Sequence, residues 1–233
     1  MGETEEISKA IQETAKLGVK GLETADKAGG FIAKVCKEPI SEISGLVTDK
    51  LRFIRWKRLV QMSDEVNQIL EEKGITETKA VPPKLALPIL EYSSLEENPN
   101  IQYLWNHLLA NAMDPQFNDE IRYGFIEMVK NITGLEAKLL NTFYQVLQKD
   151  SKLLPLENIF NHTLTKKQLI KALAVSADDY ALAANNLMRM QLIGPAILTG
   201  SITMGSEPVT IYKGIDMVTL TPLGVKFVEA CIK

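Results

Sequence analysis

Helix-start signals recur from residue 98 onward in this 233-residue chain, and they constrain its fold more than any other feature. Each signal has a side chain that can cap a free N–H group, followed by proline at the first helical position or by an acid or amide three residues later. The signals are Asn98-Pro99, Thr133 to Glu136, Thr165 to Gln168, Ser176 to Asp179, and Thr221-Pro222. Apolar residues follow them at helical spacing, so the sequence predicts a mainly α-helical protein.

The stretch from residue 48 to residue 150 is typical of a helical bundle. A long helix is expected from about Thr48 to Gly74, and a second one lies between Asn98-Pro99 and Asp114-Pro115. Three prolines make residues 75–88 a stiff connector that leads into a short helix: Pro82, Pro83 and Pro88. We therefore predict a bundle domain at 48–150.

The pattern changes after Asp150. Two short helices are predicted, the second running to Leu192-Ile193, and two β-favouring stretches follow on either side of Gly205-Ser206-Glu207-Pro208. A last helix begins at Thr221-Pro222. Because helix, turn, helix, hairpin, helix is the order of a winged-helix domain, we predict a C-terminal winged-helix-like domain with a small β-hairpin at 151–233.

Residues 4–37 are typical of an amphipathic helix with a lysine stripe. On an ideal helix with about 100° per residue, the five stripe lysines fall within about 20° of one line: Lys9, Lys16, Lys20, Lys27 and Lys34. A face of small and apolar residues, among them Leu22 and Ile32, lies opposite. We expect segment 1–47 to be an interaction surface through Lys16, Lys20, Leu22 and Ile32. Three contacts fit the pattern: an anionic membrane, the body of the protein, or self-association.

A basic run from Lys50 to Arg58 carries five positive charges and no acid. Its cations and rings are candidates for contact with an anionic partner: Arg52, Arg55, Trp56, Lys57 and Arg58. A helix packed between two neighbours explains the same residues. The predicted second helix of the C-terminal domain begins with Asp178 and Asp179, which repel phosphates, so specific DNA binding is not expected.

The composition gives no sign of catalytic machinery. The formal net charge of −3 does not indicate a polyanion-binding protein, and two cysteines cannot form a four-thiolate zinc site. His107 and His162 are not at metal-ligand spacing, and the glycine-rich nucleotide-binding motifs are absent. We interpret acid pairs such as Glu96-Glu97 as solvated surface. The expectation is a protein with no catalytic residues, no metal and no cofactor, located in the cytoplasm or peripherally at the inner membrane face.

Three stretches carry a resemblance to a known family. They are RFIRWKRLVQMSDEVNQILEEKGI from Arg52, VPPKLALPILEYSSLEENPNIQYLWNHLLANAMDP from Val81, and VTLTPLGVKFVEACIK from Val218. Over about residues 40–233 the chain resembles the abortive-infection alpha (Abi-alpha) family of bacteria. This resemblance implies a role in phage defence, in which an infected cell stops growing or dies before virus is released. It brings no catalytic residue or cofactor.

Our leading hypothesis is a non-enzymatic defence protein that acts through protein or membrane contacts. The alternative is a winged-helix regulator that binds nucleic acid, and a third reading is an enzyme with an unrecognised helical active site.

Overall fold

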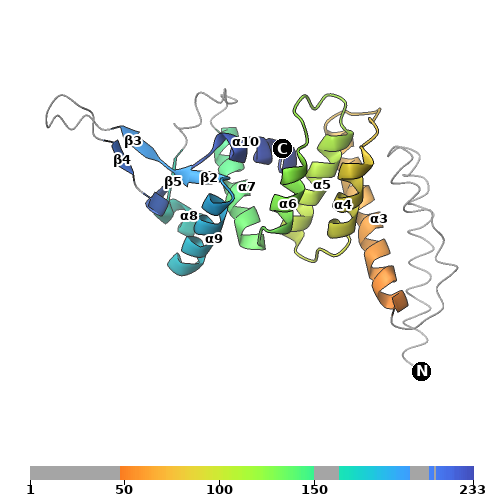
Figure 1. Ribbon diagram of the computed structural model, residues 1–233, viewed down its shortest axis with the longest axis horizontal. Coiled ribbons are helices and arrows are strands. Elements are labelled where there is room, and N and C mark those ends of the chain that lie inside the picture. Colours follow the sequence, from red (N-terminus) through yellow and green to blue (C-terminus); the bar gives the residue numbers. More distant parts are fainter. Residues whose placement is uncertain (1–47, 150–162, 200–209, 213) are drawn as a thin grey trace. The chain divides into compact units, whose positions relative to one another are not determined.

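The computed structural model describes residues 48–149, 163–199, 210–212 and 214–233 (Figure 1). Helices dominate this part of the chain, with a small antiparallel sheet, which confirms the predicted fold class. The chain divides into two compact units, Met1–Ile126 and Glu127–Lys233. The predicted amphipathic helix in segment 1–47 lies outside the described residues.

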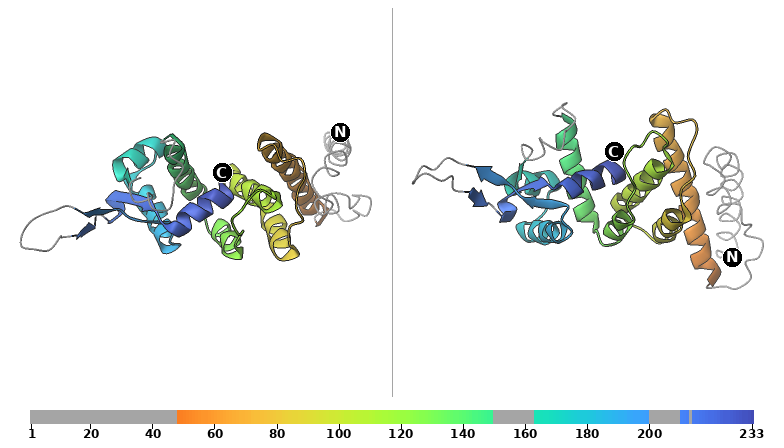
Figure 2. Two further views of the ribbon diagram at one scale, coloured as in Figure 1. Left: turned by 90° about the horizontal axis from the view of Figure 1, so that it is seen from above. Right: turned by 45° about the horizontal axis from the view of Figure 1, so that its top comes forward.

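The N-terminal unit is built on three helices that lie side by side (Figure 2): α3 (Thr48–Glu72), α4 (Pro83–Ser93) and α5 (Pro99–Met113). Helix α3 ends close to the predicted Gly74, which has a φ of +72°. A left-handed backbone suits glycine because it has no Cβ atom. Asn98 caps α5 as predicted, accepting a hydrogen bond from the Asn100 amide at 2.9 Å, and Asp114 ends the helix.

Helix α4 differs from the expectation of a connector through residue 88. It begins at Pro83, so Pro88 lies inside the helix. Proline removes one backbone hydrogen bond there. Ala86, Ile89 and Leu90 are buried on α4, which contacts both α3 and α5. The burial of these side chains outweighs the lost bond, since one fully buried Leu or Ile contributes about 1.5–3 kcal/mol.

The core of the N-terminal unit centres on α5. Trp105 is fully enclosed and its ring lies 6.4 Å from that of Tyr92, in a stacked arrangement. The buried apolar residues recur at helical spacing on the facing helices: Val60, Met62, Val66 and Leu70 on α3, and Leu104, Trp105, Leu108 and Leu109 on α5. The predicted α5 face is therefore the one that packs against the neighbouring helices.

The C-terminal unit contains α7 (Gly134–Lys149), α8 (Lys166–Leu173), α9 (Ala177–Arg189) and α10 (Pro222–Cys231), while the unit boundary falls within α6 (Tyr123–Lys130). Two of the three predicted capping boxes are confirmed as reciprocal pairs, while at the third the Asp179 amide donates to Ser176 Oγ at 3.0 Å. The Thr133 amide donates to Glu136 Oε2 at 2.7 Å, and the Glu136 amide donates to Thr133 Oγ1 at 3.3 Å. Thr165 and Gln168 make the same reciprocal pair at the start of α8.

Helix α9 is shorter than predicted. Gln191 has a φ of +57°, which ends the helical path, and the Leu192 amide donates back to the Leu187 carbonyl at 2.9 Å. Ile193 was expected in this helix but lies in strand β2 (Ile193–Pro195), opposite Leu220 of β5 (Met217–Leu220). The apolar residues after α9 are therefore sheet core.

Five short strands complete the described part of this unit. Strand β1 (Leu164–Thr165) joins β5 and β2 in a three-stranded antiparallel sheet of order β1-β5-β2. Strands β3 (Ile197–Thr199) and β4 (Thr210–Tyr212) pair antiparallel, with Ile197 opposite Tyr212, which confirms the predicted hairpin. The classification of this unit as a winged helix stays a prediction.

The contacts of α7 place it with the C-terminal unit. This helix contacts α8, α9 and α10, although its residues belong to the bundle that we predicted at 48–150. The division between Ile126 and Glu127 therefore differs from the expected boundary at 150/151. An amphipathic pattern shows that a helix buries one face but does not show which neighbour covers it. Independent folding of either unit stays a prediction.

Candidate functional site

Two arginines of the basic run hold the connection between α4 and α5. Arg55 Nε donates to Ser94 Oγ at 3.0 Å, and Arg58 Nη2 forms an ion pair with Glu97 Oε1 at 2.7 Å. Lys57 is exposed, and Trp56 is half-buried. The structure thus gives Arg55 and Arg58 intramolecular partners, as expected of a helix packed among its neighbours.

The other candidate residues are less informative. Arg52 lies in α3, but its side chain is outside the described part of the structure. The N-terminal candidates Lys16, Lys20, Leu22 and Ile32 also lie outside it. Among the candidate residues, the side chains that the structure describes are those of Arg55, Trp56, Lys57 and Arg58.

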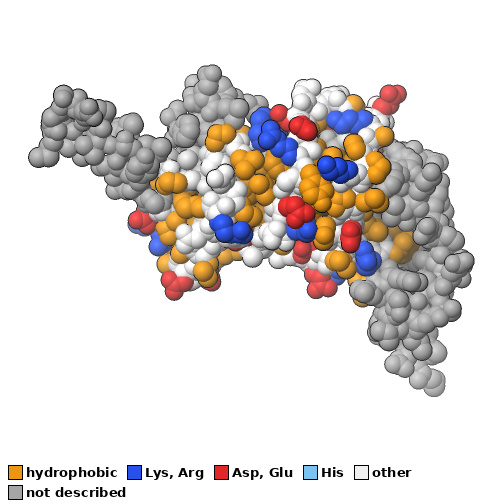
Figure 3. Space-filling model, viewed as in Figure 1, with side chains coloured by type: hydrophobic (Ala, Val, Ile, Leu, Met, Phe, Trp, Pro, Cys, Tyr) orange, Lys and Arg blue, Asp and Glu red, His pale blue; other side chains and the backbone are white. Residues whose placement is uncertain are grey.

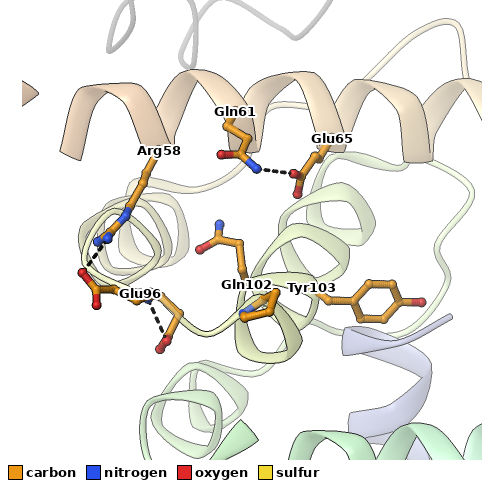
Figure 4. A pocket seen from close by; sticks show the side chains of 8 residues that line it. Arg58, Gln61, Glu65, Glu96, Gln102 and Tyr103 are labelled. Carbon is orange, nitrogen blue, oxygen red and sulfur yellow. Dashed lines mark hydrogen bonds and ion pairs between the residues drawn. The ribbon is translucent and has the colours of Figure 1, made fainter. Parts of the chain in front are cut away.

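A pocket of about 280 Å³ lies between α3 and the start of α5. It is lined by one cation, three acids, two amides, a ring and a proline: Arg58, Gln61, Glu65, Glu96, Glu97, Pro99, Gln102 and Tyr103. Figure 4 shows Gln61 and Glu65 on the side of α3 that faces Gln102 of α5, while Arg58 extends toward the acids that precede α5. Both walls carry polar side chains, whose aliphatic parts supply much of the lining, and the pocket has three acids against one cation.

Hydrogen bonds fix most of the pocket's polar groups. Glu65 accepts from Gln61 Nε2 at 2.8 Å and also from the amide of Asn106. Glu96 Oε1 accepts from the backbone amides of Glu97 and Asn98, at 2.9 and 2.7 Å. Gln102 Oε1 is different, because it is buried and accepts no hydrogen bond from the described residues. A buried acceptor without a donor is unfavourable, so this atom lowers the stability of the packing around it.

Three polar pairs connect α3 and the residue that follows it to α5 and the residues that precede α5. Arg58 pairs with Glu97, Glu65 with Asn106, and Lys73 with Asn111. Residue numbers rise together on both sides, so α3 and α5 run parallel. We call this set the α3–α5 ladder. Asn111 is fully buried, and its bond to Lys73 satisfies an amide group that would otherwise be costly to bury.

His107 lies on α5 beyond the pocket. Its Nδ1 lies 3.0 Å from the Tyr103 carbonyl oxygen, which can only accept, so Nδ1 carries the proton. Burial lowers the pKa of His107, and the nearby Lys73 acts in the same direction, although the bond to Tyr103 opposes both. The imidazole is therefore neutral at pH 7. Within the described ranges, no group of three His, Cys, Asp or Glu side chains is placed to hold a metal ion.

Helix α9 presents a mixed face to solvent. Asp178 and Asp179 are exposed in its first turn, and Leu182 is 72% exposed. Arg189 donates to Asn186 Oδ1 through Nη2 at 2.8 Å. The acids that argued against DNA contact thus lie on the surface, where they set a negative potential at the start of the helix.

The visible surface of the described residues mixes acids, bases and apolar side chains without a large region of one sign (Figure 3). Among the helices that the structure describes, none is long and apolar enough to cross a membrane. Sequence reasoning missed the pocket because its walls come from segments far apart in the chain. Two signals were visible in the sequence: Arg58 in the basic run, and the Glu96-Glu97 pair, which was interpreted as solvated surface and in which Glu97 is indeed 82% exposed.

Fold and pocket together define a mainly α-helical protein with a small antiparallel sheet and a polar, acid-rich pocket in its N-terminal unit. The chain belongs to the abortive infection alpha family, whose model matches residues 57–231. This match spans most of both units and confirms the resemblance found in the sequence. No curated protein and no solved structure matches the chain significantly.

Proposed function

We propose that this protein is a non-enzymatic phage-defence protein that acts in abortive infection through protein or membrane contacts of its N-terminal segment. The observation that carries the proposal is the family match over residues 57–231. In this proposal the protein is cytoplasmic, and the apolar face of residues 4–37 is its working surface. That surface contacts a protein partner, a second copy or the inner face of the membrane.

The placement of the reactive side chains supports a non-enzymatic role. Burial raises the pKa of the Cys231 thiol well above its ordinary value, which keeps it protonated and unreactive. Burial also raises the pKa of Tyr180 to about 12, and its hydroxyl donates to the Ile215 carbonyl at 2.9 Å. The shifted pKa values of His107, Tyr180 and Cys231 thus all follow from packing in the core.

Phage challenge of bacteria tests the proposal. Cells that make the protein should release fewer virions, and Leu22→Glu/Ile32→Glu should abolish this protection while the circular dichroism spectrum is retained. Leu87→Glu is a matched control, because Leu87 is a 58% exposed leucine of α4 and should accept the same change without effect. Full protection by the folded double variant would overturn the N-terminal mechanism. An unchanged virion yield for the natural protein over a broad phage panel would overturn the defence role.

Nucleic-acid binding is the second candidate function. Lys167 and Lys171 are exposed on α8, which is the observation that favours it. Asp178 and Asp179 oppose it, so we expect at most weak, salt-sensitive retention on duplex DNA. Sedimentation with acidic liposomes and gel retardation with DNA distinguish the two functions. A DNA complex that survives physiological salt would favour the regulator.

A further inference from the structure

We propose that the exposed face of α9 binds a second copy of this chain, with the two α9 helices antiparallel across a two-fold axis. The face is a stripe of four exposed residues, which we call the α9 stripe: Asp178, Leu182, Asn185 and Arg189. This contact is separate from the proposed N-terminal mechanism, because it uses residues of the C-terminal unit alone.

The α9 stripe lies on the side of the helix that faces away from the core. At about 100° per residue, its four members fall within about 60° of one another. The buried residues of α9 are on the opposite side of the helix: Tyr180, Ala183, Ala184 and Leu187. Leu182, near the centre of the stripe, is 72% exposed, the largest value among the large apolar side chains that the structure describes. A partner that covers Leu182 removes apolar surface from water.

The α9 stripe carries opposite charges at its two ends. Asp178 is in the first turn of the helix and Arg189 is in the last turn, about 16.5 Å further along the axis at 1.5 Å per residue. Neither side chain has an ion-pair partner among the residues that the structure describes. Both charges are therefore available to a partner that carries both signs, whereas a nucleic acid would be repelled at the Asp178 end.

The order of the α9 stripe is self-complementary. The steps from Asp178 to Leu182, Asn185 and Arg189 are four, three and four residues, so the spacing is the same when it is read backwards. In an antiparallel pair, Asp178 of each copy therefore lies opposite Arg189 of the other. The two copies of Leu182 lie about 4.5 Å apart along the axis, on either side of the two-fold axis, where they can pack on each other. A patch that meets its own copy in this way gives a closed dimer.

Arg189 is held in position before a partner binds. Its Nε and Nη2 atoms donate to Asn186 Oδ1 at 3.1 and 2.8 Å. Asn186 Nδ2 in turn donates to Oε1 of the buried Glu136 at 2.8 Å. Because the guanidinium group has five N–H donors, these two bonds leave donors for a carboxylate. A side chain whose rotamer is already fixed loses less conformational entropy on binding, so this arrangement favours the ion pair with Asp178 of a second copy.

Sedimentation equilibrium of the full chain tests the proposal. One helix on each side buries less area than a standard interface, so we expect a weak dimer with a micromolar dissociation constant. Leu182→Glu should raise this constant about ten-fold, because both leucines lose their apolar contact. Leu87→Glu is the matched control, since Leu87 is a 58% exposed leucine of α4. A natural chain that stays monomeric at about 0.5 mM, or a Leu182→Glu dimer of unchanged affinity, would overturn the proposal.

Exchange of the two charges tests the antiparallel arrangement. Asp178→Arg places two cations together at each end of the dimer, and Arg189→Asp places two acids there, so each variant alone should bind itself about ten-fold more weakly. An equal mixture of the two variants should regain the natural affinity, because each cation then faces an acid. Lys167→Asp is the control, since Lys167 is an exposed cation of α8 outside the stripe. Circular dichroism shows that each variant is folded, and a folded mixture that does not regain affinity would refute the arrangement.

Other occupants of the α9 stripe give different results. Leu22→Glu/Ile32→Glu should leave the dimer intact, and its loss in that variant would assign self-association to the N-terminal segment instead. If Leu182→Glu abolished protection while the natural chain was monomeric, the stripe would bind another protein and the second copy would be excluded. These outcomes are independent of the defence role: a dimer without protection would refute that role alone, and protection by a monomeric natural chain would refute the dimer alone.

Discussion

Replacing Gly224 by alanine tests how closely α10 packs against the chain that follows α9. Gly224 is the third residue of α10, and its amide donates to the Thr221 cap at 2.9 Å. A Cβ atom at this position would lie 1.8 Å from the Leu192 carbonyl oxygen and 2.8 Å from the carbonyl carbon. Both are backbone atoms, so the clash cannot be relieved by a change of rotamer, and the start of α10 must move.

Three effects contribute to the expected change in the free energy of unfolding. Displacement of a packed element costs about 1–3 kcal/mol. The Thr221 amide also donates to the Leu192 carbonyl at 3.1 Å, and weakening this bond costs about 0.5–1.5 kcal/mol. The greater helix propensity of alanine stabilises the variant by at most about 1 kcal/mol. We therefore expect Gly224→Ala to lower the free energy of unfolding by about 2–3 kcal/mol.

Urea unfolding followed by far-UV circular dichroism measures this loss. Gly124→Ala is the matched control, because Gly124 is the second residue of α6 and a Cβ atom there has no neighbour within 4 Å. It should leave the stability unchanged or raise it by up to about 1 kcal/mol. The reasoning fails if Gly224→Ala is as stable as the natural protein and its free energy of unfolding depends on urea concentration in the same way. In that case α10 does not pack on Leu192 as described.

Three further predictions concern the C-terminal unit. Glu136 is 3% exposed, caps α7 and accepts from Asn186 Nδ2 at 2.8 Å, so Glu136→Ala should cost about 2–3 kcal/mol in a urea titration. A double-mutant cycle with Asn186→Ala should give a coupling of about 1 kcal/mol, and additive costs would contradict this contact. A fragment of residues 127–233 should melt cooperatively while 151–233 should not, because only the first contains α7; equal melting curves would show that α7 is dispensable. Burial raises the pKa of Tyr180 in the folded protein to about 12, against an ordinary value of 10. The stability that the protonated hydroxyl contributes is therefore complete below pH 10 and is lost as the pH rises from 10 to 12, because the unfolded chain loses this proton first. The stability difference between the natural protein and Tyr180→Phe, measured by denaturant unfolding, should shrink over that range, and a constant difference would refute the assignment.

Local signals could be predicted from the sequence because they involve residues that are close in the chain. The caps at Asn98, Thr165 and Thr221 each satisfy an amide two or three residues ahead, so their chemistry is visible in a short window. The apolar face of α5 was visible for the same reason. Helix existence and type were therefore predicted well, except where a proline such as Pro88 is tolerated by packing.

Contacts between distant segments could not be predicted in this way. Strand β1 is two residues long, and Thr165 looked like a cap alone, while its pairing with Met217 depends on a segment that comes much later in the chain. The Arg58–Glu97 pair joins residues 39 positions apart, so the run of cations showed its charge but not its partner. The pocket was missed because it exists only after α3 and α5 are aligned.

The α3–α5 ladder also has a mechanical consequence. Its pairs extend from Arg58 to Lys73, the residue after α3, which is about 22 Å along the helix axis at 1.5 Å per residue. If α3 slid by one turn, about 5.4 Å, all three pairs would separate together, so a slide of α3 along α5 is opposed at three separate points. A pull along the axis of α3 would therefore strain all three pairs in parallel, and none of them would have to break before the next one bears load.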